Sequence, residues 1–125
     1  MKDFVFHLTH RPGEIGRVAN VLGRVGINIK SMAAMTFGGQ GVVRIIPDNV
    51  DSARAALHDA NIRFQESELI TVLVENQAGE LANVADKLSN AGINVHAMYV
   101  VGLEGDLVDI AFAVDDVKKA KKLFE

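Results

Sequence analysis

Short apolar runs alternate with amphipathic helical segments along the first half of the chain. Four apolar runs bounded by polar residues predict β-strands. They are Phe4–Leu8, Ile27–Phe37, Val42–Ile46 and Ile62–Phe64. Two segments between them carry apolar residues at helical spacing. These residues are Ile15, Val18, Ala19, Leu22 and Val25 in the first segment, and Val50, Ala53, Leu57 and Ala60 in the second. The predicted order of elements is β-α-β-β-α-β.

Glycine, proline and asparagine mark where these elements begin and end. Pro12 has a fixed φ suited to a first helical turn, and Glu14 places negative charge near the positive end of the helix dipole. Gly26 suits the left-handed conformation that ends many helices, and Asn61 would end the second helix. The run Gly38–Gly41 ("GGQG") joins two strands and has no following helix or lysine. It therefore predicts a hairpin turn rather than a phosphate-binding loop.

The second half of the chain repeats the first at a constant offset of 66. The nineteen residues from Arg11, RPGEIGRVANVLGRVGINI, align with the nineteen from Gln77, QAGELANVADKLSNAGINV, and eight positions are identical. A repeat of this length indicates two copies of one folding unit. In the second copy we expect strands at 69–74, 95–103 and 107–114, a helix with Leu81, Val84, Ala85 and Leu88 on its apolar side, and a last helix over 117–124. Asp48 or Asn49 is the candidate cap of the second helix in the first copy, and Asp115 or Asp116 is that of the last helix in the second copy.

The two copies are predicted to meet at the polar link Gln65–Glu68, which divides the chain into units at residues 1–66 and 67–125. The second copy has no counterpart of Ile62–Phe64, so it lacks the last strand of the unit. In a split β-α-β sheet that strand lies at the edge, beside the first strand. Leu69–Val74 would then present an open edge, which we expect a loop, a partner chain or the first copy to cover.

Composition narrows the classes of function. The chain has 125 residues, with 13 basic against 16 acidic side chains and a net charge of −3, which argues against a general nucleic-acid binder. It contains no cysteine, so disulfides and thiolate chemistry are excluded. The first residues lack the apolar segment of a signal peptide, and no apolar run approaches about 20 residues. We expect a cytoplasmic protein that does not associate with membranes.

Catalytic and metal-binding patterns are not apparent. No nucleophile–base set, metal-ligand spacing or phosphate loop is recognisable, so we predict that the protein is not an enzyme and has no cofactor. His7 and His10 stand three apart at the end of a strand and tend toward opposite faces, which argues against a metal site. The basic run Lys118–Lys122 is interpreted as the solvated face of the last helix. The aromatic signature of RNA-binding sheets is missing.

The repeated motif resembles the ACT domain, a small module that regulates amino-acid metabolism. The resemblance rests on an apolar strand, a turn ending in Pro12-Gly13 or Ala78-Gly79, an amphipathic helix, and the sequences Gly-Ile-Asn-Ile or Gly-Ile-Asn-Val. It covers both copies and nearly the whole chain. It implies an α+β fold of two ferredoxin-like βαββαβ units, with antiparallel sheets and helices on one face, the second unit lacking its last strand. It also implies association through the sheets, and an amino-acid site where the loop after strand one meets the start of strand two, often across an interface.

This resemblance places candidate ligand contacts in both copies. A helix N-terminus suits a carboxylate, glycine permits close approach, and asparagine offers a donor and an acceptor to a zwitterion. The candidates in the first copy are His10, Arg11, Gly13, Glu14, Ile15 and Asn28. Those in the second are Asn76, Gln77, Gly79, Glu80, Leu81 and Asn94. Family members often carry Asn or Asp two residues before the proline; Asn76 matches this pattern, His10 departs from it, and Ala78 replaces the proline.

Each of these residue types also has a purely structural explanation. Turns and helix caps alone would explain the glycines. Asn28 and Asn94 can be turn residues that follow a left-handed glycine. Glu14 and Glu80 can serve the helix dipole.

The sequence therefore predicts a regulatory protein that binds a small molecule, an amino acid, at domain interfaces. We expect a homodimer or higher oligomer that modulates a partner enzyme or another regulator allosterically. Ile15, Ile29, Leu81 and Val95 near the candidate sites favour an apolar ligand such as a branched-chain amino acid. The alternative is a ligand-free interaction or dimerisation module that uses its sheet edges.

Overall fold

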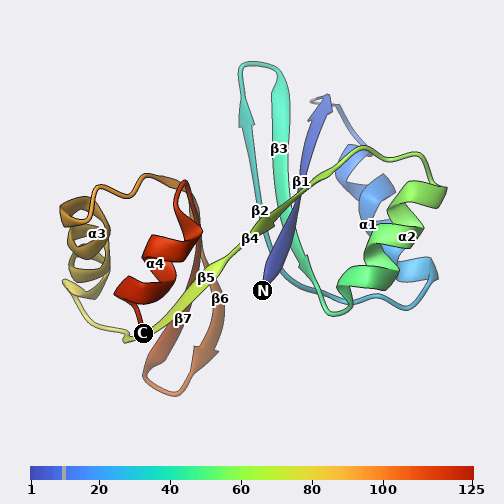
Figure 1. Cartoon of the computed structure of the whole chain (residues 1–125). Helices are drawn as coiled ribbons and strands as arrows, with labels where there is room; N and C mark the ends of the chain where they lie inside the picture. Colours follow the sequence, from blue (N-terminus) through green and yellow to red (C-terminus); the bar gives the residue numbers. More distant parts are fainter. Residues whose placement is uncertain (10) are drawn as a thin grey trace. The chain divides into compact units, whose positions relative to one another are not determined.

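The computed structural model describes residues 1–9 and 11–125. These residues form two compact units, one over Lys2–Ser67 and one over Glu68–Glu125 together with Met1. Each unit combines an antiparallel sheet with helices on one of its faces (Figure 1). The predicted α+β, ferredoxin-like fold is confirmed.

The first unit follows the order βαββαβ. Its elements are β1 (Lys2–Thr9), α1 (Glu14–Arg24), β2 (Ile29–Phe37), β3 (Gln40–Pro47), α2 (Val50–Asp59) and β4 (Gln65–Glu68). The strand order in the sheet is β2-β3-β1-β4, and β3 is antiparallel to both β1 and β2. The sheet edges are therefore β2 on one side and β4 on the other.

The core of the first unit lies between the sheet and its helices. Side chains of a strand alternate between the two faces of a sheet, so Phe4, Phe6 and Leu8 of β1 all point into the core. They pack against buried residues of β3, the two helices and the connections. These are Val18, Leu22, Ile27, Val43, Ile45, Ala53, Leu57 and Ile62. Full burial of one such Phe or Leu stabilises the fold by roughly 1.5–3 kcal/mol relative to exposure.

The second unit has the same order without the last strand. Its elements are β5 (Ile70–Glu75), α3 (Glu80–Asn90), β6 (Val95–Glu104), β7 (Leu107–Val114) and α4 (Val117–Leu123). Residues 68–125 form a sheet of three strands in the order β5-β7-β6. The missing fourth strand was predicted from the repeat, and it leaves β5 at the sheet edge.

Capping explains where the helices end and begin. Gly26 and Gly92 follow α1 and α3 with φ of 76° and 72°, and the next residue's amide bonds back to the helix at 3.0 Å in both cases. This is the Schellman pattern of helix termination. Asn49 and Asp116 cap α2 and α4 through their side chains, which selects one candidate from each predicted pair.

The fourth strand lies later in the sequence than predicted. Ile62–Phe64 is not a strand, and β4 instead spans Gln65–Glu68, the stretch expected to be a link. Asn61 adopts a φ of 57°, and the chain then directs Ile62 into the core. Phe64 stacks on Phe4 with ring centroids 5.0 Å apart. These apolar side chains fill the core instead of extending the ladder.

Polar side chains hold β4 at the sheet edge. Glu66 accepts two hydrogen bonds from Arg54 of α2, both at 2.7 Å. The hydroxyl of Ser67 donates to the buried carboxylate of Asp3 on β1. The sequence of Gln65–Glu68 has no apolar alternation, because its partners are charged and polar groups rather than the core.

The apolar stripe on α1 is wider than its buried face. Val18 and Leu22 are buried, whereas Ala19 is exposed and Ile15 and Val25 are 46% and 59% exposed. Three further residues predicted to face inward are exposed as well. They are Ala60, Leu81 and Ala85. The sheet covers only a narrow arc of each helix, so residues at the margin of the apolar stripe stay at the surface.

Two local predictions also need correction. α1 begins at Glu14 rather than at Pro12, because Gly13 has a left-handed φ of 92° and serves as the N-cap. The β2–β3 turn is confined to Gly38 and Gly39, with φ of 57° and 81°, and the next two residues already belong to β3. Positive φ at both central residues is the geometry that matches the twist of a two-residue hairpin.

Candidate functional site

The N-terminal ends of α1 and α3 differ from those of α2 and α4. Gly13 and Gly79 are their N-caps, both with a φ of 92°, which strongly favours glycine. Asn49 and Asp116 instead accept a hydrogen bond from an amide three residues on, at 3.0 Å. Within the described part of the chain, no side chain caps α1 or α3. The Glu80 amide of α3 donates to the Gln77 carbonyl at 3.3 Å. The other first-turn amides of the two helices and the helix dipoles remain available to an anion.

Two arginines surround the single carboxylate at the start of α1. Arg11 Nε donates to Glu14 Oε1 at 2.8 Å, and Arg17 Nη2 lies 3.6 Å from Glu14 Oε2. The hydrogen bond from Arg11 is the main cause that lowers the pKa of Glu14, and the charges of Arg11 and Arg17 add to it against some desolvation. Glu14 is therefore ionised at neutral pH, and this end of α1 carries two cations for one anion.

The equivalent end of α3 has a different charge. The repeat places Gln77 and Asn83 where the first copy has Arg11 and Arg17, while Glu80 is retained. Glu80 thus has a negative charge without a neighbouring cation from these positions. These positions therefore hold two arginines and one glutamate at the start of α1, but only one glutamate at the start of α3.

A cavity of about 320 Å³ lies beside the start of α1. It is lined by the end of β1, by Arg11, Glu14 and Ile15, and by the middle of the β2–β3 hairpin. Its volume falls at the lower limit of about 300–1,000 Å³ that small-molecule sites occupy. Three predicted residues of the first copy are thus brought together around one space.

Asn28 does not share this space within the first unit. It follows the C-terminal end of α1, and the helix between it and Gly13 has 11 residues, or about 16 Å of rise. The Asn28 amide donates to Asp48 Oδ1 at 3.2 Å, and the Asp48 amide donates to the Asn28 carbonyl at 3.0 Å. Asn28 therefore joins the α1–β2 connection to the β3–α2 connection.

Asn94 makes the same structural contact in the second unit. Its amide donates to Asp115 Oδ1 at 3.1 Å and its Nδ2 donates to Asp115 Oδ2 at 3.0 Å. The side-chain hydrogen bond from Asn94 is the main cause that lowers the pKa of Asp115. Both asparagines thus make structural contacts with an aspartate, Asn28 through its backbone and Asn94 through its backbone and side chain.

The remaining second-copy candidates lie between β5 and α3. The Asn76 amide donates to the carbonyl of Asp106 in the β6–β7 turn at 2.8 Å, and the Gln77 amide donates to Glu75 at 2.9 Å. Leu81 is 54% exposed on α3. In the first copy, His10 lies outside the described residues.

Neither a metal-binding cluster nor a membrane-spanning helix is found among the described residues. No group of three or more His, Cys, Asp or Glu side chains is arranged to hold a metal ion. Among the helices described, none is long and apolar enough to span a membrane.

Comparison with known families decides what kind of module this is. The family model for the ACT domain pair matches residues 1–124. The chain belongs to the ACT domain pair family. No curated protein sequence matches it significantly.

Solved structures agree with this ACT domain pair in fold. Protein BT0572 from Bacteroides thetaiotaomicron is 22% identical, with a TM-score of 0.87 over 98% of this chain and 84% of that one. The ligand-free regulatory subunit of aspartate kinase from Thermus thermophilus is 13% identical, with a TM-score of 0.70 over 98% and 86%. The corresponding subunit from Thermus flavus is 16% identical, with a TM-score of 0.61 over 99% and 92%. At these identities the comparison shows a shared fold.

Sequence reasoning missed the residues of β2 and β3 that line the cavity beside the start of α1. The residues concerned are Ala34, Met35, Thr36, Gly41 and Val43. Strand pairing brings them to α1, because Leu8 at the end of β1 lies opposite Gly41 of β3. A glycine inside a strand often marks a place where something approaches the backbone closely. Gly41 was the one local signal that could have indicated that β3 lines the cavity.

Proposed function

We propose that this ACT domain pair is a non-catalytic regulatory protein that binds an amino acid at the start of α1. The observation that carries the proposal is the cavity of about 320 Å³ at a helix N-terminus that has no side-chain cap and is flanked by Arg11 and Glu14. The match to the ACT domain pair family supports an amino-acid ligand, because the resemblance of the sequence to ACT domains implies one.

The charges at this end of α1 match both ends of a zwitterion. First-turn amides and the Arg11 guanidinium are donors for the ligand carboxylate. Glu14 is an ionised acceptor for the ligand ammonium, because the arginines keep its pKa low. Ile15, which is 46% exposed, and Met35, which is 66% exposed, offer apolar surface to an aliphatic side chain.

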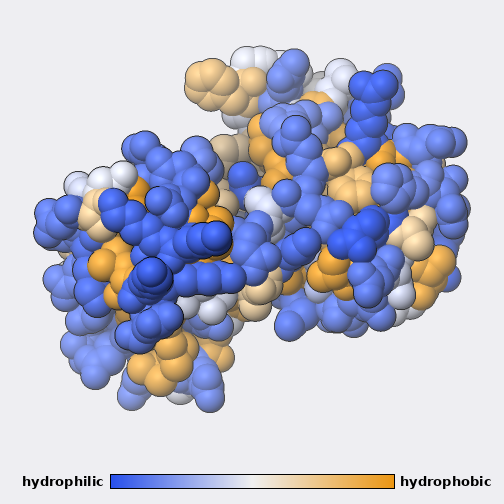
Figure 2. Space-filling model, viewed as in Figure 1, coloured by the Kyte–Doolittle hydropathy of each residue, from blue (hydrophilic) through white to orange (hydrophobic). Residues whose placement is uncertain are grey.

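We further propose that the protein acts as a homodimer or higher oligomer through the β2 edge of the first sheet. β2 is an edge strand, and it exposes Met32, Met35 and Phe37 by 47%, 66% and 88%. Figure 2 shows apolar surface at the tip of the β2–β3 hairpin. A second copy would cover this surface. If the two copies can adopt two arrangements, a ligand that binds one arrangement more tightly shifts the population toward it.

The regulated partner follows by analogy from the fold. Regulatory subunits of aspartate kinase share it at low identity, so a partner enzyme of amino-acid metabolism is the first candidate. Ligand binding can shift the partner's activity only by the difference in ligand affinity between the two arrangements.

A ligand-free interaction module is the second candidate. It is favoured by the pairing of Asn28 with Asp48 and of Asn94 with Asp115. Both asparagines were predicted to contact the ligand, but the backbone of Asn28 and the side chain of Asn94 already bond within their own units.

A titration of the full chain with the twenty amino acids tests the proposal. A ligand that binds only the folded state raises the midpoint of thermal unfolding. Arg11→Gln should weaken the best ligand about ten- to a hundredfold, the range for one hydrogen bond to a charged group. Arg24→Gln is the matched control, because Arg24 lies in the last turn of the same helix. If no amino acid shifts the midpoint at millimolar concentration while the oligomer persists, the interaction module is the better account.

A further inference from the structure

A second cavity lies at the other edge of the first sheet, between β1 and the segment that connects α2 to β4. It has a volume of about 880 Å³. Val5 and His7 of β1, His58 of α2 and residues 61–65 line it. None of these residues lines the cavity beside α1. The two cavities are separate features of the same unit.

The cavity exists because the chain after α2 joins the sheet late. β4 begins at Gln65 rather than at Ile62, so residues 61–64 run beside β1 without extending β4. Phe64 fixes this segment by stacking on Phe4, with centroids 5.0 Å apart, and by a tilted contact with Phe6 at 6.3 Å. The same anchoring that displaced the predicted strand therefore holds one wall of the cavity in place.

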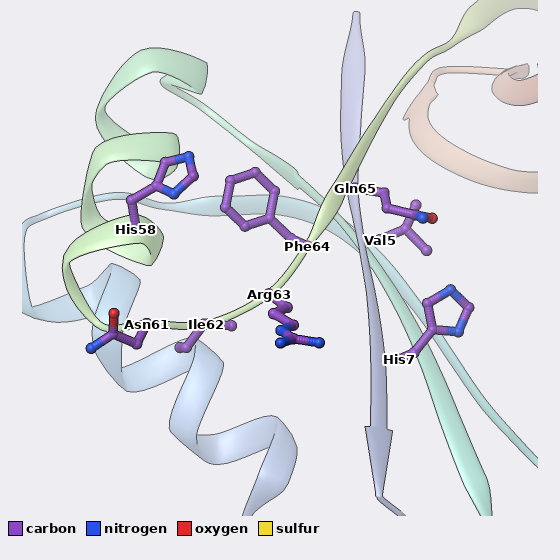
Figure 3. Close-up of a pocket in the computed structure, with 8 residues that line it drawn as sticks. All are labelled: Val5, His7, His58, Asn61, Ile62, Arg63, Phe64 and Gln65. Carbon is purple, nitrogen blue, oxygen red and sulfur yellow. The ribbon is translucent and has the colours of Figure 1, made fainter.

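Every polar side chain that lines this cavity can donate a hydrogen bond, and none of them is negatively charged. They are the guanidinium of Arg63, the imidazoles of His7 and His58, and the amides of Asn61 and Gln65. None of the lining residues is a carboxylate. In the view of Figure 3, Arg63 lies between His58 and Phe64 on the α2 side and His7 on the β1 side.

Three arginines of the first unit are closely paired with a carboxylate, and Arg63 is not paired with any described one. Arg11, Arg44 and Arg54 each form an ion pair at 2.7–2.9 Å. Arg63 has no ion pair with any of the residues that the structure describes. Its planar fork of donors is therefore available to a carboxylate.

The apolar part of the lining suits a flat group. Phe64 and His58 form a tilted ring pair with centroids 5.2 Å apart. Ile62 beside them is buried in the core, whereas Val5 alternates with Phe4 and Phe6 and therefore points to the other face of the sheet. Aromatic rings prefer offset or edge contacts with such surfaces. A ligand with one negative end and one flat apolar end would contact both kinds of group.

We propose that this cavity is a second binding site, for a small aromatic carboxylate. The carboxylate is bound by Arg63 and the neighbouring amide donors, and the ring lies against Phe64 and His58. This site is additional to the amino-acid site proposed at α1, and neither depends on the other. The described residues of the second unit form the sheet β5-β7-β6, without a strand in the place that β4 takes in the first unit.

The test is an NMR titration of the full chain with benzoate, followed by ¹H–¹⁵N amide shifts. We expect saturable shifts at His58–Gln65 and Val5–His7, and benzoate should bind more tightly than acetate because the ring contributes. Arg63→Gln should weaken benzoate at least about tenfold. Arg24→Gln, which removes an exposed arginine outside the cavity, should leave the affinity within about twofold.

Four results would overturn the proposal. They are shifts that do not saturate, equal binding by Arg63→Gln, equal affinity for acetate and benzoate, and tighter binding of inorganic phosphate than of benzoate. Because Arg63 is exposed, its replacement should preserve the fold, and the dispersion of the amide spectrum checks this. Shifts confined to the start of α1 would support the amino-acid site and count against this one, so the two proposals fail separately.

Discussion

The buried carboxylate of Asp3 gives the sharpest stability prediction. Asp3 is fully buried, and its Oδ2 accepts from Arg44 Nη1 at 2.9 Å. Arg44 lies opposite Val5 in the β1–β3 ladder, so Asp3 and Arg44 form a diagonal pair that a long side chain can span. Ser67 of β4 bonds to both groups. Three strands of the first sheet are thus joined through one carboxylate.

Asp3→Ala removes that carboxylate and leaves the Arg44 side chain, only 17% exposed, without its counter-charge. Breaking a buried pair in this way costs about 3–5 kcal/mol. That is a large part of the roughly 5–15 kcal/mol by which a domain is stable. Asp3→Asn keeps the shape and part of the hydrogen bonding, so its cost should be smaller, about 1.5–3 kcal/mol.

Urea unfolding followed by far-UV circular dichroism measures these costs, since the chain has no tryptophan. The destabilisation is expected in the transition that reports on Lys2–Ser67, the unit that contains Asp3, Arg44 and Ser67. Lys2→Ala is the matched control, because Lys2 forms a looser ion pair with Glu66 at 3.7 Å and is 44% exposed. A loss of less than about 1 kcal/mol for Asp3→Ala would refute the reasoning, because exposed pairs contribute that little.

Three further predictions concern pH, backbone conformation and self-association. Hydrogen bonds from Arg54 lower the pKa of Glu66 from 4.5, so this pair's contribution should be complete above pH 4.5 and lost as the pH falls through the lowered value; Glu66→Gln should reduce this acid loss in a urea series. Gly13→Ala places a side chain at a φ of 92° and should destabilise by about 1–2 kcal/mol, whereas Gly16→Ala, with open space around it, should stabilise by about 0.5–1 kcal/mol; equal effects would contradict the left-handed cap. Phe37→Ser, at a site 88% exposed, should weaken any oligomer seen by sedimentation without changing the unfolding midpoint of the monomer.

The element order of both units could be predicted from the sequence because local physics decides it. Apolar alternation and helical spacing act over a few residues, and the glycines at 26 and 92 terminate helices through their own backbone freedom. The repeat made the prediction stronger, since the same pattern occurs twice. β4 was misplaced for a non-local reason: Ile62 and Phe64 resemble a strand, but they pack on the core, while the polar β4 depends on Arg54 and other side chains from distant elements.

The candidate site was only partly accessible to sequence reasoning. Arg11, Glu14 and Ile15 are close in sequence, and the structure places them around one cavity. Asn28 shares their motif but lies at the other end of an 11-residue helix, so a shared motif did not mean a shared location. No rule about neighbouring residues could place Met35 beside α1.

The sequence by itself determined the family, the two repeated units and the missing last strand, because these follow from patterns within each short segment. Only the tertiary structure decided which apolar residues are buried, which carboxylates are paired and where the two cavities lie. Those properties arise when strands distant in sequence pair and helices cover one face. Strand register and side-chain contacts between elements then set burial and charge environment, and neither is encoded in any single segment.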